Sequence, residues 1–156
     1  MENQTATTTT IPNTILLLGP TGSGKTPLGQ VLEERGLWGQ TCLHFDFGAN
    51  LREIVAREEP DAFIGADDIV LLRQMFQEGL LLEDEHFPLA ARILGRFIDR
   101  YAPVPSTWLV LNGLPRHLGQ AQAMDGVLNV RAVVFLDCSA QIVAERILRN
   151  AGGDRD

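Results

Sequence analysis

The chain has 156 residues, of which 45% are hydrophobic, 21% charged and 6% aromatic, as in an ordinary soluble globular protein with one buried core. Its 13 Lys and Arg against 20 Asp and Glu give a formal net charge of −7 and a pI near 4.9. This acidic balance argues against nucleic acid as a partner, because a polyanion needs a basic face. A small anionic ligand is compatible with it, since a few local arginines can overcome an acidic background.

The N-terminal segment and the cysteines indicate the expected compartment. Residues 1–12 are polar and Thr-rich, without the basic start and apolar centre of a signal peptide, and we expect a disordered tail. No apolar run approaches the roughly 18 residues of a membrane span. Cys42 and Cys138 make no disulfide framework and lack metal-ligand spacing with the histidines. We therefore expect a reduced, cytoplasmic protein without a membrane partner.

Short apolar runs of β type alternate with helical patterns along the chain. We expect strands at residues 14–18, 42–47, 107–111 and 130–137. We expect helices at residues 26–35, 49–57, 67–77, 83–100 and 139–150, with Gly36 and Gly79 ending the first and the third. This alternation predicts an α/β domain over residues 13–156, with a parallel sheet covered by helices on both faces.

The turn after the first predicted strand carries a phosphate-binding motif. Residues 19–26 read Gly-Pro-Thr-Gly-Ser-Gly-Lys-Thr, which fits the Walker A pattern of the P-loop nucleoside triphosphate hydrolase fold. Glycines let successive backbone N–H groups converge on phosphate oxygens, and the N-terminus of the following helix adds a positive dipole. We predict that Lys25 binds the β- and γ-phosphates of ATP and that the Thr26 hydroxyl ligates Mg²⁺. The residues predicted to bind ATP in this segment are Gly19, Thr21, Gly22, Ser23, Gly24, Lys25 and Thr26.

Three later segments have counterparts in one known family. They read Gly48-Ala49-Asn50-Leu51-Arg52, Gly79-Leu80-Leu81-Leu82-Glu83-Asp84-Glu85 and Asn112-Gly113-Leu114-Pro115-Arg116, the last followed by Gln120. With the P-loop they resemble the adenylate kinase and nucleoside monophosphate kinase family, which carries Gly-Asp-x-Leu-Arg, Gly-x-Leu-Val-Pro-Asp-Glu and Asp-Gly-Phe-Pro-Arg with a Gln four residues later. The matches keep the family's order and approximate spacing from Gly19 to Arg146.

The resemblance implies roles for residues on the acceptor side. Arg52 and Arg116 would hold the monophosphate and, with Lys25, serve catalysis. Gln120 would hydrogen-bond the acceptor base, while Arg146 matches an arginine that packs on the base and phosphates of the donor nucleotide. The residues assigned to the monophosphate are Gly48, Arg52, Leu82, Gly113, Arg116 and Gln120, in or beside a helical insertion at residues 48–100.

The chemistry of phosphoryl transfer favours arginine for this task. Two anionic substrates must be held in line despite their repulsion, and arginine offers a bidentate geometry that lysine lacks. Arg116 also follows a strand end, where ligands bind in sheets of this kind. An isolated arginine on a helix is usually solvated, and phosphoryl transfer needs no histidine. The side chains that we expect to be solvated or structural are Arg57, Arg92, Arg96, His44, His86 and His117.

The chain departs from the family at two carboxylates. Asn112 stands where the family has the Asp before Gly-Phe-Pro-Arg, and Ala49 stands where it has the Asp of Gly-Asp-x-Leu-Arg. By resemblance, both carboxylates organise water around Mg²⁺. An amide contributes no negative charge, so we expect metal binding to be weakened but not abolished. Asp46 could compensate, or the metal could rest on Thr26 and the phosphates alone.

A third departure concerns the C-terminal part. The family continues with a lid, a last strand and a long helix, whereas this sequence stops at residues 151–156, where the lid would begin. We expect the final strand and helix to be missing and the strand at 130–137 to form a partly bare sheet edge. A fragment, a partner that covers this face, and a reduced binder all stay open. Without such a partner we expect a monomer.

Three functions are compatible with these residues. The favoured one is an adenylate kinase-like enzyme that transfers the γ-phosphoryl group of ATP to a nucleoside monophosphate, with Mg²⁺ and no covalent intermediate. The second is a nucleotide-binding protein of the same fold with weak or no turnover, favoured by Asn112, Ala49 and the absent lid. The third is a P-loop kinase of another small metabolite, faintly favoured by a likeness of residues 26–29 to shikimate kinases. Which base is accepted stays open.

Overall fold

The structure of the chain is a computed structural model that describes residues 12–57, 59–78, 80 and 82–149. Most of the predicted tail at residues 1–12, the predicted helix end at Gly79 and the predicted start of a lid at 151–156 lie outside the described residues.

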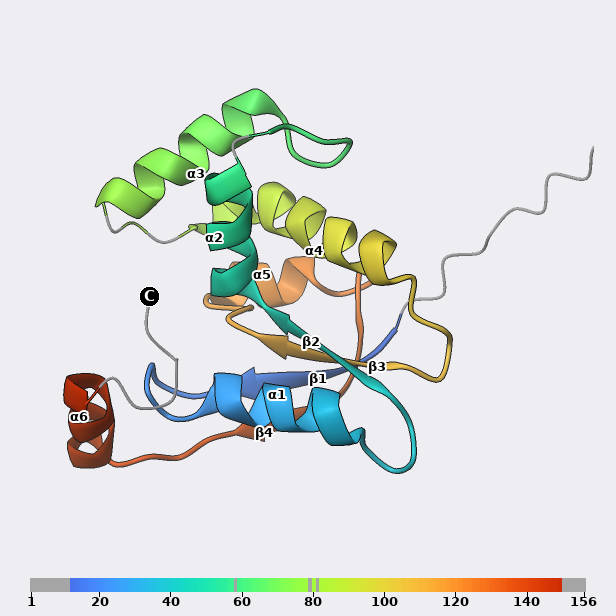
Figure 1. Cartoon of the computed structure of the whole chain (residues 1–156), viewed down its shortest axis with the longest axis vertical. Coiled ribbons are helices and arrows are strands. Elements are labelled where there is room, and N and C mark those ends of the chain that lie inside the picture. The colour runs from blue at the N-terminus through green and yellow to red at the C-terminus, as the bar shows by residue number, and fades with distance from the viewer. Residues whose placement is uncertain (1–11, 58, 79, 81, 150–156) are drawn as a thin grey trace, which may run out of the picture.

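Four strands form one parallel sheet in the order β2-β3-β1-β4 (Figure 1). They are β1 (Asn13–Leu18), β2 (Cys42–Asp46), β3 (Trp108–Asn112) and β4 (Asn129–Phe135). Each lies within two residues of its predicted bounds, and the α/β prediction is confirmed. Because all four run the same way, their carboxyl ends meet at one edge of the sheet, where such folds bind ligands.

Six helices connect or follow the described strands, together with a short 3₁₀ turn, η1 (Asp84–His86). They are α1 (Lys25–Arg35), α2 (Phe47–Arg57), α3 (Ala66–Glu78), α4 (Phe87–Tyr101), α5 (Leu118–Ala123) and α6 (Ala140–Arg149). The helix predicted at 83–100 begins four residues later, because residues 84–86 take the tighter turn and Pro88 suits a first helical turn. We did not predict α5, since six residues with two glutamines and one glycine show no apolar periodicity.

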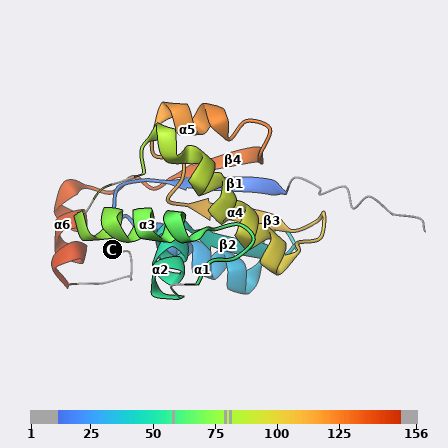
Figure 2. The same ribbon diagram turned by 90° about the horizontal axis from the view of Figure 1, so that it is seen from above.

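The two faces of the sheet pack against different helices, as predicted. On one face, the helices between β2 and β3 form a large apolar core around Phe45 and Leu111, both fully buried. On the opposite face of the sheet, the strand residues Ile15, Leu17 and Val110 pack against α1. Figures 1 and 2 show α1 and α5 on opposite sides of the strands.

The strand β4 is an edge strand, as predicted. Among the described strands it pairs only with β1, and its Val133 and Phe135 are 55% and 66% exposed. The helix α6 lies past the carboxyl end of the sheet, beside the turn between β1 and α1, and does not cover β4 (Figure 1). No helix of the described ranges has the length and apolarity needed to cross a membrane.

Ion pairs tie the helices between β2 and β3 together. The Arg96 guanidinium on α4 donates to Asp61 at 2.5 Å and lies 3.5 Å from Glu53 on α2, which also accepts from Arg100 at 2.9 Å. The Arg96 side chain is only 10% exposed, so our expectation that it is solvated is wrong. The other two arginines that we expected to be solvated, Arg57 and Arg92, have side chains that are 50% and 43% exposed. An isolated helix segment gives no sign of the acidic loop that folds over Arg96.

Replacing Arg96 should destabilise the fold. The Arg96→Met variant leaves the Asp61 carboxylate without its cation, and we expect a loss of about 2 kcal/mol in unfolding free energy, the scale of a hydrogen bond to a charged group. Urea unfolding followed by circular dichroism measures it. The matched control is Arg57→Met, whose exposed pair with Glu53 at 3.8 Å should cost well under about 1 kcal/mol. Equal losses in both variants would contradict a buried role for Arg96.

The same pair should make stability depend on pH. Partial burial raises the pKa of the Asp61 carboxyl, but hydrogen bonds from Arg96 and from the Phe63 and Ile64 N–H groups outweigh it, and the pKa lies below its ordinary value of 3.8. A carboxyl with a lowered folded pKa contributes stability above its ordinary pKa and loses it as pH falls through the folded pKa. We expect the unfolding free energy of wild type to fall more steeply below about pH 4 than that of Asp61→Asn. Parallel pH profiles would refute this assignment.

Candidate nucleotide and metal site

The turn between β1 and α1 has the backbone shape that the Walker A motif predicts. Gly19 and Gly24 take φ angles of 146° and 103°, which residues other than glycine rarely adopt. A Cβ on Gly19 would lie 2.8 Å from the Leu136 carbonyl oxygen, so only glycine fits there. The helix α1 then begins at Lys25, after Gly24, which has no side chain to cap it. Such an N-terminus is a ready site for an anion.

Two side chains of this turn are buried with polar groups directed inside it. Lys25 is 8% exposed, and its ammonium donates to the carbonyls of Gly19 and Pro20 at 3.0 and 2.8 Å. The Ser23 hydroxyl is buried without a hydrogen-bond partner among the described residues. A buried, unpaired hydroxyl is unusual in a folded protein and fits a ligand that would satisfy it. Lys25 is also the only lysine in the sequence.

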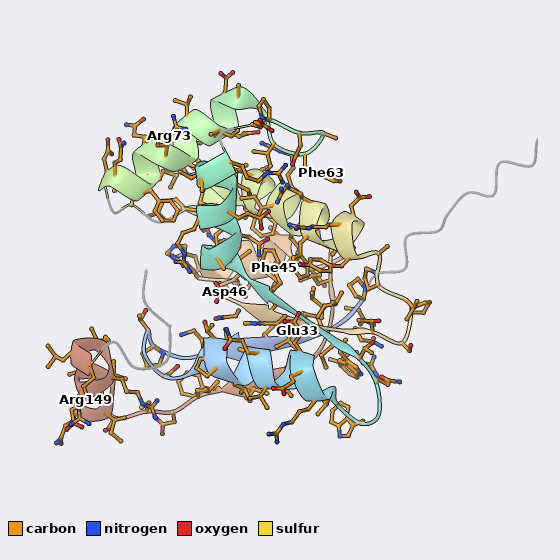
Figure 3. All side chains as sticks on the ribbon, viewed as in Figure 1. Glu33, Phe45, Asp46, Phe63, Arg73 and Arg149 are labelled. Carbon is orange, nitrogen blue, oxygen red and sulfur yellow. The ribbon has the colours of Figure 1, made fainter. Side chains whose placement is uncertain are left out.

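Three polar side chains meet beside the turn, at the carboxyl ends of the strands. The Thr26 hydroxyl donates to Asp46 Oδ2 at 2.7 Å, and the Asn112 amide donates to the same oxygen at 3.0 Å and to the Thr26 hydroxyl at 2.9 Å. Sheet register explains the meeting, because Asn112 ends β3 directly opposite Asp46 and beside Leu17 of β1. Figure 3 shows Asp46 at the end of β2, between α1 and the first turn of α2.

These three groups fit Mg²⁺ better than a softer metal. Asp46 and Thr26 offer a carboxylate and a hydroxyl oxygen, to both of which the Asn112 amide donates, and Mg²⁺ is usually held by one or two carboxylates together with water and substrate phosphates. Within the described ranges, no group of three or more His, Cys, Asp or Glu side chains could hold a metal by itself. The site therefore matches an ion that arrives with a nucleotide.

A cavity of about 360 Å³ opens beside this cluster, between α1, β2, α2 and the end of α4. Thr26, Asp46, Ala49 and Arg52 are among the residues that line it. Arg52, which the sequence predicts to hold a monophosphate, is thus on the same cavity as the predicted metal ligand Thr26. Gly48, the glycine that opens the family-like segment of residues 48–52, lies in the first turn of α2.

The segment after β3 is organised around Gln120. This side chain is fully buried; its oxygen accepts from the Arg116 N–H at 2.8 Å, and its amide donates to the Leu82 carbonyl at 2.8 Å. Arg116 itself is exposed, with its Nε donating to the Gly113 carbonyl at 3.1 Å. Gly113, at φ 91°, lets this segment approach Phe47, where a Cβ would be 3.0 Å from the Phe47 Cβ. The predicted acceptor residues Leu82, Gly113, Arg116 and Gln120 are therefore brought together.

Arg146 of α6 reaches back to the Walker A turn. Its guanidinium donates to the carbonyls of Ser23 and Gly22 at 3.1 and 3.3 Å, and to the Cys138 sulfur at 3.8 Å. The side chain predicted to contact the donor nucleotide thus lies against the turn predicted to bind its phosphates. Thr21, also predicted to bind ATP, is exposed at the tip of the turn.

No protein-family model matches the chain, but individual relatives do. It is 29% identical over 139 residues to an adenylate kinase of Kosmotoga olearia, covering 85% of this chain and 57% of that protein. It is 28% identical over 144 residues to the human UMP-CMP kinase, covering 88% of this chain and 66% of that protein. The chain thus spans about three fifths to two thirds of the length of these relatives. An adenylate kinase of Stenotrophomonas maltophilia is 32% identical over 144 residues, with 88% of this chain and 67% of that protein covered. By its similarity and its fold, the chain belongs to the adenylate kinase and nucleoside monophosphate kinase family.

Proposed function

We propose that the chain transfers the γ-phosphoryl group of ATP to a nucleoside monophosphate, giving ADP and a nucleoside diphosphate. The observation that carries the proposal is the turn at residues 19–24, which joins the N-terminus of α1, the Lys25 ammonium and the unpaired Ser23 hydroxyl. The relatives named adenylate kinase and UMP-CMP kinase support phosphoryl transfer between nucleotides.

The donor half of the site would act by positioning and charge. A polyphosphate entering the turn would replace the Gly19 and Pro20 carbonyls as the partner of Lys25, and would give Ser23 its missing hydrogen bond. Bound Mg²⁺ would neutralise charge that develops on the phosphates; Thr26 and Asp46 are the residues that would hold it, and Asn112 would orient Asp46. Arg146 would keep the turn in shape through the Ser23 carbonyl.

The acceptor half would fix the monophosphate through arginines. Arg116, at the carboxyl end of β3, and Arg52, on α2, would hold its phosphate in line with the donor. Gln120 has a positioning task first, since it holds the Leu82 carbonyl and the Arg116 backbone. Because the Gln120 side chain is fully buried, a direct hydrogen bond from its second amide hydrogen to the acceptor base requires that the surrounding segment move. We therefore propose that backbone groups near Leu82 line the base pocket and that Gln120 sets their position.

A second candidate is nucleotide binding without useful turnover. It is favoured by the neutral side chains of Asn112 and Ala49 at positions where the family resemblance places carboxylates. It differs from the first candidate in a measurable way, because it requires ATP binding but no dependence of ADP formation on any monophosphate.

Lys25 should be needed for both binding and turnover. In Lys25→Met the charge-assisted contact with the phosphates is lost, and we expect ATP to bind about 10-fold or more weakly by calorimetry. Coupled ADP production from Mg-ATP with each of AMP, CMP, UMP and GMP should fall at least about 100-fold. Wild-type ATP binding with no turnover on any monophosphate would favour the second candidate. Unchanged ATP binding in Lys25→Met would exclude both.

Arg116 should affect the acceptor more than the donor. We expect Arg116→Met to raise the KM of the accepted monophosphate by about 10-fold or more, through loss of hydrogen bonds to its phosphate, with the KM of ATP nearly unchanged. Arg131→Met, at an exposed position on the edge strand β4, is the matched control and should leave both constants as in wild type. An Arg116 variant that keeps the wild-type KM for the monophosphate would remove Arg116 from the acceptor site.

A further inference from the structure

The Asp46 carboxylate lies beside the Walker A turn, and hydrogen-bond donors from three elements fix its orientation. Asp46 Oδ2 accepts from the Thr26 hydroxyl on α1 and from the Asn112 amide on β3, at 2.7 and 3.0 Å. Its other oxygen, Oδ1, accepts from the Ala49 N–H in the first turn of α2, at 2.9 Å. A group held by donors from three elements is pre-organised, since it loses little freedom when it binds a further partner.

The two oxygens of this carboxylate have separate tasks. Oδ1 satisfies one of the first N–H groups of α2, an ordinary role for an Asp before a helix. Oδ2 contributes nothing to that helix and instead faces Thr26, the residue that follows Lys25. Capping of α2 therefore accounts for Asp46 Oδ1, whereas Oδ2 faces the proposed nucleotide site.

Charge explains why Asn112 accompanies Asp46. The Asn112 amide nitrogen lies 3.0 Å from Asp46 Oδ2, so a carboxylate at position 112 would bring two negative oxygens into contact. Like charges at that separation cannot both ionise without a large cost. A neutral donor at position 112 avoids this repulsion and orients Asp46 through the hydrogen bond to its Oδ2. The neighbouring Ala49 adds no charge, so Asp46 holds the negative charge of this cluster.

We propose that Asp46, at the end of β2, positions Mg²⁺ at this site and supplies the negative charge that the metal needs. Asn112 orients the Asp46 carboxylate through its amide hydrogen bond. The inference rests on the proposed function, because the metal would arrive with ATP. One carboxylate beside a hydroxyl fits the few protein ligands that Mg²⁺ uses when phosphates supply others. Asn112 acts through Asp46 and not as a second charge.

The test uses Mn²⁺ as a paramagnetic substitute for Mg²⁺ and compares three proteins. ATP affinity is measured by calorimetry in EDTA, and Mn²⁺ affinity of the ATP complex by electron paramagnetic resonance. Asp46→Asn keeps an oxygen for the Ala49 N–H, so α2 should stay capped. We expect its metal-free ATP affinity to remain within about 2-fold of wild type, while its Mn²⁺ affinity falls about 10-fold or more, as for other residues that position a metal.

The double variant Asp46→Asn/Asn112→Asp provides the rescue. It exchanges the carboxylate on β2 for one at position 112 on β3, whose side chain lies 3.0 Å from Asp46 Oδ2 in wild type, and it keeps the net charge of the pair. We expect Mn²⁺ affinity within about 3-fold of wild type, because the charge remains beside Thr26. A merely structural role for Asp46 would not be restored by a carboxylate on another strand.

The single variant Asn112→Asp gives an independent reading that does not need a folded Asp46→Asn. It places two carboxylates in contact, so the protein with ATP alone should have a lower Tm than wild type. Added Mn²⁺ would neutralise the pair, and we expect a larger rise of Tm than in wild type. An equal or smaller rise would overturn the proposal.

The outcomes separate this inference from the proposed function. If Asp46→Asn retains the wild-type Mn²⁺ affinity, the metal rests on Thr26 and the phosphates, and the inference fails while the nucleotide site stands. If wild type does not bind ATP in EDTA or with metal, the phosphate site itself is wrong and both proposals fail.

Discussion

The site depends on one constraint, the sharp turn of residues 19–24 between a buried strand and a helix. Glycine at positions 19 and 24 permits φ angles that other residues resist, and this conformation directs the first N–H groups of α1 and the Lys25 ammonium to one side. The core serves this geometry, because Ile15 and Leu17 anchor β1 while Leu28 and Leu32 hold α1 against it. The anion binding that we propose thus rests on backbone shape, and the surrounding residues would determine which anion is bound.

A parallel sheet brings together residues that are far apart in the chain. Thr26 lies in the first turn of α1, while Asp46 and Asn112 end β2 and β3, yet the fold places them within hydrogen-bond distance at one edge of the sheet. The helices between β2 and β3 are held by the Arg96 ion pairs, which keep α2 and Arg52 over the same cavity. Fold stability and site geometry therefore share residues on α2, where Glu53 pairs with Arg96 one residue after Arg52.

The sequence predicted much of this arrangement, and the misses have physical causes. Strand bounds and the Walker A turn follow from local patterns that a single segment carries, as the apolar run before Gly19 shows. The short helix α5 was not predicted, because its six residues show no apolar periodicity. The burial of Arg96 and Gln120 could not be predicted, since each depends on a partner more than 30 residues away in the chain, Asp61 and Leu82 respectively. Asp46 was recognisable only as a polar residue at a strand end, because its partners are set by sheet register.

The most direct measurement of the central claim uses the fact that Lys25 is the only lysine of the sequence. An acyl-phosphate derivative of ATP transfers its acyl group to an amine beside the bound phosphates, and mass spectrometry locates the product. We expect acylation of Lys25 that excess ATP or ADP suppresses and adenosine does not, since the phosphates provide the binding. Acylation confined to the N-terminal amine, or labelling of Lys25 that ATP does not suppress, would contradict a polyphosphate site at this turn.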